Sequence, residues 1–190
     1  MKTDEAFELK DAYRNLASGR NYDAIVSFQA LENRGVVEAK RYIGFMYERG
    51  LGVPADFATA ERYYRQAAEQ NDILSQRYLA RLLKDAGRNE EALEWYSRAA
   101  EGGSASAEYW LYVMYRRGIG ALPSTNKAMQ HLEKSALMGH IFARRDLALA
   151  YLRGSFGASG RLKGLSMLLM TIVRFPSALR DSAYSDDLRS

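Results

Sequence analysis

The sequence predicts an all-α solenoid, and three observations agree on this fold class. A block that begins with tyrosine or leucine and reaches glycine within four residues recurs at positions 47, 83, 115 and 151, which are 36, 32 and 36 residues apart. Apolar residues follow the period of a helix on both sides of each block. Self-similarity at a fixed spacing in this range is typical of stacked helical repeats.

The first half of each repeat predicts one helix. A small residue is followed four residues later by an apolar one, and an aromatic or leucine comes after another four, so these positions share one helical face. The copies are Ala39-Ile43-Tyr47, Ser75-Leu79-Leu83, Ala107-Leu111-Tyr115 and Ala143-Leu147-Tyr151. A Gly-x-Gly follows Tyr47 and Tyr115 and should end the helix, because glycine adopts the left-handed geometry of helix ends.

The second half of each repeat predicts a second helix. Copies begin at residues 24, 60, 92, 128 and 164, and small residues in them let paired helices approach closely. Gly19-Arg20-Asn21 and Gly87-Arg88-Asn89 are predicted short turns. We therefore expect five antiparallel helix pairs within 1–175, over about 4–35, 36–71, 72–103, 104–139 and 140–175, and a C-terminal cap over 176–190. The aromatic residues at repeat positions should form the core: Tyr47, Tyr63, Tyr64, Trp95, Tyr96, Tyr115 and Tyr151.

The second repeat resembles a known family most fully. It reads Ile43-Gly44, Tyr47, Gly50, Gly52-Val53, Asp56, Ala60, Tyr63-Tyr64 and Ala67-Ala68. This pattern is similar to the Sel-one-like repeat, a branch of the tetratricopeptide-like α-solenoids, and the resemblance covers roughly residues 12 to 172. It implies a right-handed superhelix that serves as a non-catalytic, bacterial protein–protein interaction adaptor or scaffold.

Residues of the first helices that packing does not use should line a groove for a partner. Arg41-Tyr42 recurs as Arg77-Tyr78, and arginine and aromatic residues are common interface hot spots. Arginine can grip carboxylates, so we expect an acidic peptide or protein segment with apolar anchors. The expected groove consists of Arg41, Tyr42, Phe45, Arg77, Tyr78, Arg81, Tyr109, Trp110, Arg116 and Arg145.

Two other interpretations of these residues remain open. Tyrosines at helical spacing often pack in a core, and helical arginines often lie over apolar neighbours with their charge in water. Basic residues interleaved with aromatics could instead bind a single-stranded nucleic acid. Because 23 acidic residues balance 27 basic ones and no dense basic cluster occurs, we do not expect nucleic acid as the partner.

The last predicted helix is apolar on all sides. Leu165, Leu168, Leu169 and Ile172 would form a second apolar surface, although a terminal repeat should be polar outside. Either the tail covers it, or it forms a homodimer contact or docks the chain, as a regulatory subunit, to a membrane-associated complex. The run is too short to span a bilayer, so we expect no transmembrane segment.

Catalysis, cofactors and metals are not expected. The chain has no cysteine, and His131 and His140 accompany neither a nucleophile nor a metal-ligand spacing, which argues against a hydrolase. The first residues are charged and contain no apolar run of signal-peptide type. We therefore expect a cytoplasmic protein, with a periplasmic one whose signal peptide has been removed as the alternative.

Overall fold

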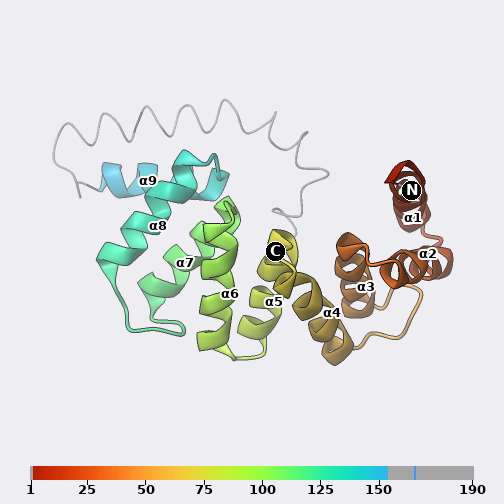
Figure 1. Cartoon of the computed structure of the whole chain (residues 1–190). Helices are drawn as coiled ribbons and strands as arrows, with labels where there is room; N and C mark the ends of the chain where they lie inside the picture. Colours follow the sequence, from red (N-terminus) through yellow and green to blue (C-terminus); the bar gives the residue numbers. More distant parts are fainter. Residues whose placement is uncertain (1, 154–164, 166–190) are drawn as a thin grey trace. The chain divides into compact units, whose positions relative to one another are not determined.

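The fold is a succession of α-helices. The computed structural model describes residues 2–153 and Leu165, and this part of the chain contains no β-strand. The first helix of each predicted pair is α1 (Lys2–Ala17), α3 (Val37–Arg49), α5 (Ile73–Asp85), α7 (Ala105–Arg117) or α9 (Ile141–Leu152). The second helices are α2 (Asn21–Asn33), α4 (Phe57–Glu69), α6 (Asn89–Glu101) and α8 (Thr125–Leu137) (Figure 1). The all-α prediction is confirmed.

The chain forms two compact units, Met1–Ala99 and Ala100–Ser190. Helices that follow one another along the chain also pack together: α1 to α5 do so in the N-terminal unit, and α7 to α9 do so in the C-terminal unit. Each connection is short, which makes neighbouring helices antiparallel. The tenth predicted helix and the capping segment 176–190 lie outside the described residues, apart from Leu165, which is helical and half exposed.

The Gly-x-Gly blocks end the first helices as predicted. Gly50 and Gly118 follow α3 and α7 with φ values of 67° and 70°, the left-handed conformation that favours glycine. Polar side chains begin the next helices. Asp56 accepts hydrogen bonds from the backbone N–H groups of residues 58 and 59 at the start of α4, and Ser124 accepts one from that of residue 127 at the start of α8. The predicted short turns separate α1 from α2 and α5 from α6.

Small residues lie where paired helices touch. Ala60, Ala80, Ala107 and Ala128 are all at most 2% exposed. At Gly44 of α3 a Cβ atom would lie only 2.9 Å from the Tyr64 ring of α4. The backbone of α3 therefore lies directly against that ring, which a larger side chain would prevent.

The predicted aromatic core is only partly buried. Tyr64, Trp95 and Tyr96 are buried as expected. The expectation is wrong for the four others, which are only half-buried: Tyr47, Tyr63, Tyr115 and Tyr151. Tyr47 and Tyr63 stack on each other with ring centroids 6.1 Å apart, so they cover the edge of the core and do not fill its centre.

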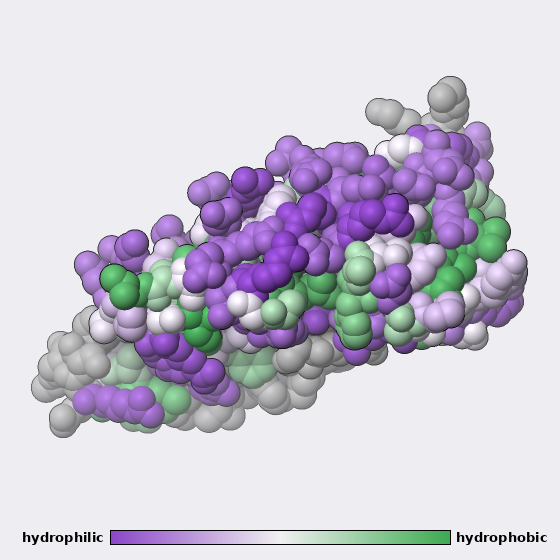
Figure 2. All heavy atoms as spheres, turned by 90° about the horizontal axis from the view of Figure 1, so that it is seen from below, coloured by the Kyte–Doolittle hydropathy of each residue, from purple (hydrophilic) through white to green (hydrophobic). Residues whose placement is uncertain are grey.

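The exposed large hydrophobic residues are scattered along the described chain. They include Phe7, Tyr22, Phe57, Leu122 and Leu137. Hydrophilic side chains cover most of the face that Figure 2 shows. Within the described residues, no helix combines the length and the hydropathy that crossing a membrane requires.

The contact between Gly44 and Tyr64 can be tested by substitution. Gly44→Val should lower the free energy of unfolding by about 1–3 kcal/mol, because the added atoms overlap a ring inside a packed core. Ala30→Val, at an exposed position of α2, is the control and should cost only about 0.5 kcal/mol. Urea unfolding followed by circular dichroism measures both. If Gly44→Val were as stable as the parent protein, the close approach of α3 to the Tyr64 ring would be wrong.

Candidate protein-binding surface

All ten residues of the predicted groove lie on first helices. Arg41, Tyr42 and Phe45 are on α3; Arg77, Tyr78 and Arg81 are on α5; Tyr109, Trp110 and Arg116 are on α7; and Arg145 is on α9. Their surroundings differ sharply between the two units, and each unit is therefore described separately.

Arg41 joins α3 to the start of α5. Its side chain is 9% exposed, and its Nη1 and Nη2 donate hydrogen bonds of 2.7 Å to Asp72 Oδ1 and Glu38 Oε1. Burial alone would lower the pKa of Arg41, but these two carboxylates outweigh burial and raise it, so the charge is retained. The other carboxylate oxygen of Asp72 accepts the backbone N–H of Ser75 and so caps α5. The Arg41 guanidinium is thus already paired with carboxylates of its own chain.

Arg81 is likewise bound by a carboxylate of the chain. Its Nη2 lies 2.6 and 2.7 Å from the two carboxylate oxygens of Glu48, which is buried in α3. The Tyr64 hydroxyl donates to the same carboxylate at 2.9 Å. Burial, and then the negative charge of Glu48, raise the pKa of Tyr64 well above its ordinary value. The ion pair is therefore part of the protein interior, where a buried carboxylate requires partners.

The two Arg-Tyr pairs have the same local geometry. The guanidinium carbon of Arg41 lies 5.2 Å from the centroid of the Tyr42 ring, and that of Arg77 lies 5.0 Å from the Tyr78 ring. Arg77 is only 8% exposed. The Tyr42 ring also stacks on Phe28 of α2 at 5.1 Å. These cation–π contacts fix the side chains against their own helices.

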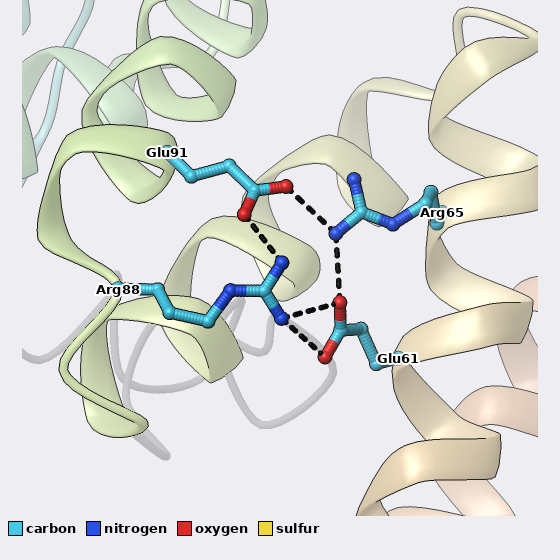
Figure 3. A network of polar contacts seen from close by, with 4 residues as sticks. All are labelled: Glu61, Arg65, Arg88 and Glu91. Carbon is cyan, nitrogen blue, oxygen red and sulfur yellow. Dashed lines mark hydrogen bonds and ion pairs between the residues drawn. The ribbon is translucent and has the colours of Figure 1, made fainter.

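Four more charged residues form a closed ring between α4 and α6. Arg65 contacts Glu61 and Glu91 at 2.7 Å each, and Arg88 contacts the same two carboxylates at 2.8 and 2.5 Å (Figure 3). Burial alone would raise the pKa of Glu91, but the hydrogen bonds from the two arginines outweigh it and lower the pKa. The ring connects the second helices of consecutive repeats.

In the C-terminal unit an aromatic residue takes the place of Arg41. The Tyr109 hydroxyl donates to Asp146 at 3.0 Å, and the Tyr109 ring stacks at 4.7 Å on His140, which caps α9. Burial and the charge of Asp146 raise the pKa of Tyr109 to about 12. Arg41 contacts Asp72, the N-cap residue of α5, and Tyr109 contacts His140, the N-cap residue of α9. In both cases the N-cap residue lies 31 residues further along the chain.

Arg116 and Arg145 are exposed, whereas Arg41 and Arg77 of the predicted groove are buried. The Arg116 guanidinium carbon lies 4.9 Å from the centroid of the Tyr112 ring, and that of Arg145 lies 5.3 Å from the Phe142 ring. The prediction omitted Arg153, which is exposed at the end of α9. In the repeat pattern Arg153 occupies the position of Arg49 and Arg117, each of which comes two residues after the tyrosine of the recurring block.

The two histidines have structural partners. His131 Nδ1 lies 2.5 Å from the buried Glu108 carboxylate, and its ring stacks on Tyr115. His140 Nδ1 accepts the backbone N–H of Ala143. Among the residues that the structure describes, no three histidine or carboxylate side chains gather in a way that could hold a metal ion.

Comparison with known proteins identifies the repeat. The model of the Sel1 repeat matches residues 37–72, 75–104 and 105–140. The crystal structure of a Sel1 repeat protein from Oxalobacter formigenes has a TM-score of 0.77 and 25% identity, over 87% of this chain and 72% of that one.

Two curated relatives are much longer than this chain. The Sel1-like repeat-containing protein L21 of Acanthamoeba polyphaga mimivirus is 22% identical over 63% of this chain, and the match spans 22% of L21. HRD3 of Candida glabrata, a component of an ERAD-associated E3 ubiquitin-protein ligase, is 38% identical over 38% of this chain and 8% of its own length.

The charged ring between α4 and α6 should make stability depend on pH. The lowered pKa of Glu91 means that its ion pairs stabilise the fold above the ordinary glutamate pKa of about 4.3, and that this contribution is lost as the pH falls below it. Glu91→Gln should lower the free energy of unfolding by about 0.5–1 kcal/mol at pH 7, and by less at pH 3. The control is Glu94→Gln, at an exposed position of the same helix. Equal pH profiles for the two variants in urea unfolding would contradict this role of the ring.

Proposed function

The chain belongs to the Sel1 repeat family, and we propose that it is a non-catalytic adaptor that holds a protein segment against the first helices of its repeats. One observation carries this proposal. On α3 and α5 an arginine lies beside the half-buried ring of the tyrosine that follows it, in repeated geometry, and these are residue types that dominate protein interfaces. A stacked repeat also offers a long surface for its size.

The charges of the helices support an acidic partner. Helix α5 carries three basic residues, Arg77, Arg81 and Lys84, and one acidic residue, Asp85. Helix α6 carries four glutamates and one basic residue, Arg98. A negatively charged segment would therefore favour α5 over α6. The half-buried rings beside the arginines would receive its apolar side chains.

One relative supports participation in an assembly. HRD3 is described as a component of a ubiquitin ligase, so at least one protein with similar repeats works within a larger complex. We carry over only this general role.

Selection of peptides from a random library displayed on phage, with the full chain as bait, tests the proposal. We expect enriched peptides that are acidic and carry large apolar residues. Tyr42→Ala and Trp110→Ala, on first helices, should weaken the binding of the selected peptides by about tenfold or more, because truncation of an aromatic hot spot removes more than 1 kcal/mol.

Tyr22→Ala is the matched control, because Tyr22 is an exposed aromatic residue of a second helix. Its affinity for the selected peptides should stay within about twofold of the parent protein. Failure to enrich any peptide, or a loss of binding only with Tyr22→Ala, would overturn the proposal.

A further inference from the structure

Charged residues are distributed unevenly along the chain. Residues 1–108 contain 18 acidic and 15 basic side chains, whereas residues 109–153 contain two acidic and seven basic ones. The first stretch therefore has a net charge of −3, and the second, although much shorter, has a net charge of +5. Such asymmetry points to a negatively charged partner for the basic part of a chain.

One side of α8, a helix of this basic stretch, presents lysines and aliphatic residues to solvent. Its exposed positions are spaced by three, four and three residues, which places them on one side of the helix, and an exposed methionine follows directly after its end. These residues form the α8 face: Lys127, Gln130, Lys134, Leu137 and Met138. Glu133, the one acidic residue of this helix, is half-buried.

The lysines and the leucine distinguish α8 from the second helix of the preceding repeat. In α6, 36 residues earlier, the positions of Lys127 and Leu137 hold Glu91 and Glu101. Only the position of Lys134 is basic in both helices, because α6 has Arg98 there. The repeat itself therefore does not require a basic and aliphatic face, and the face is a property of α8.

The positive charges of the α8 face are accessible from solvent. Lys127 Nζ lies 5.1 Å from the centroid of the Tyr115 ring, and Lys134 Nζ lies 3.8 Å from Glu108 Oε1. The Lys134 side chain is 63% exposed, so water screens this ion pair, which is also longer than a hydrogen bond. Glu108 is already paired with His131 at 2.5 Å. An anion can therefore approach both lysines without breaking a buried contact.

The residue types of the α8 face favour a lipid surface over other anionic partners. Lysine is depleted at protein interfaces, and leucine is under-represented among their hot spots. Single-stranded nucleic acid is held by aromatic stacking, but the α8 face contains no aromatic ring. Leu137 is 84% exposed and protrudes from the helix. An aliphatic side chain of this kind can enter an acyl layer without a pocket shaped to receive it, while lysines meet the headgroups.

We propose that the α8 face docks the chain on the surface of a membrane that contains anionic lipids. Leu137 and Met138 enter the boundary of the acyl layer, and Lys127 and Lys134 contact the headgroups. The two lysines are two helical turns apart, about 10 Å, so both reach the headgroups when α8 lies parallel to the membrane. The inference goes beyond the proposed adaptor function, because it concerns a second helix and a partner that is not a protein.

Flotation of the full chain with lipid vesicles tests the proposal. One set of vesicles consists of phosphatidylcholine, and the other also contains phosphatidylserine. We expect binding to the second set only, and less of it as salt is added. Lys127→Gln and Lys134→Gln should each weaken this binding by about fivefold, which is the contribution of one lysine near an anionic surface. Leu137→Ala should weaken it by about fivefold or more, because less apolar surface enters the lipid.

Arg98→Gln and Leu74→Ala are the matched controls. Arg98 is exposed at the position of Lys134 one repeat earlier, and Leu74 is an exposed leucine of α5. Both lie outside the α8 face, so each variant should bind the vesicles within about twofold of the parent protein. Circular dichroism of each variant checks that the helices are intact.

Three results would overturn the inference: equal binding to the two sets of vesicles, no binding to either set, or equal losses with the controls and the α8 variants. If Lys134→Gln weakened the binding of an oligothymidylate or of the peptides selected from the library, and not that of vesicles, the α8 face would instead belong to nucleic acid or to a protein partner. The library selection involves no lipid, so the adaptor function and membrane docking can fail separately.

Discussion

Close contact between paired helices is the constraint on which the rest of the structure depends. Alanine and glycine occupy the contact positions, and at Gly44 the neighbouring Tyr64 ring leaves no space for a side chain. Because the backbones approach so closely, a large side chain such as Tyr64 fits at the contact only where the facing residue is as small as Gly44. Helix spacing, core composition and the positions left for polar residues all follow from this one requirement.

Polar residues in the N-terminal unit mainly hold neighbouring helices together. Arg41, Arg81 and Arg65 each bind carboxylates from a different helix. Their charges are therefore used within the fold, and a partner would have to compete with well-formed ion pairs to reach them. In the C-terminal unit aromatic contacts perform part of the same role. Two units built from one repeat thus use different contacts at equivalent positions.

The helices and their ends could be predicted from the sequence, because helical periodicity and the glycines after Tyr47 and Tyr115 are local signals. The placement of the candidate residues on first helices also followed from repeat phase. The ion pairs were not predicted. Glu48 and Arg81 are 33 residues apart and Arg41 and Asp72 are 31 apart, so their contacts depend on how repeats stack. Exposure of an arginine depends on such contacts, which a single repeat cannot reveal.

The hydrogen bond from Arg41 to Asp72 couples the stability of two neighbouring repeats. When the N-terminus of α5 frays, Asp72 no longer caps that helix and no longer holds the Arg41 guanidinium of α3. Local opening in one module therefore loosens the one before it, and cooperativity passes along the array between nearest neighbours. Protection of backbone amides from hydrogen exchange would then be shared by blocks of adjacent modules, and no single helix would open alone.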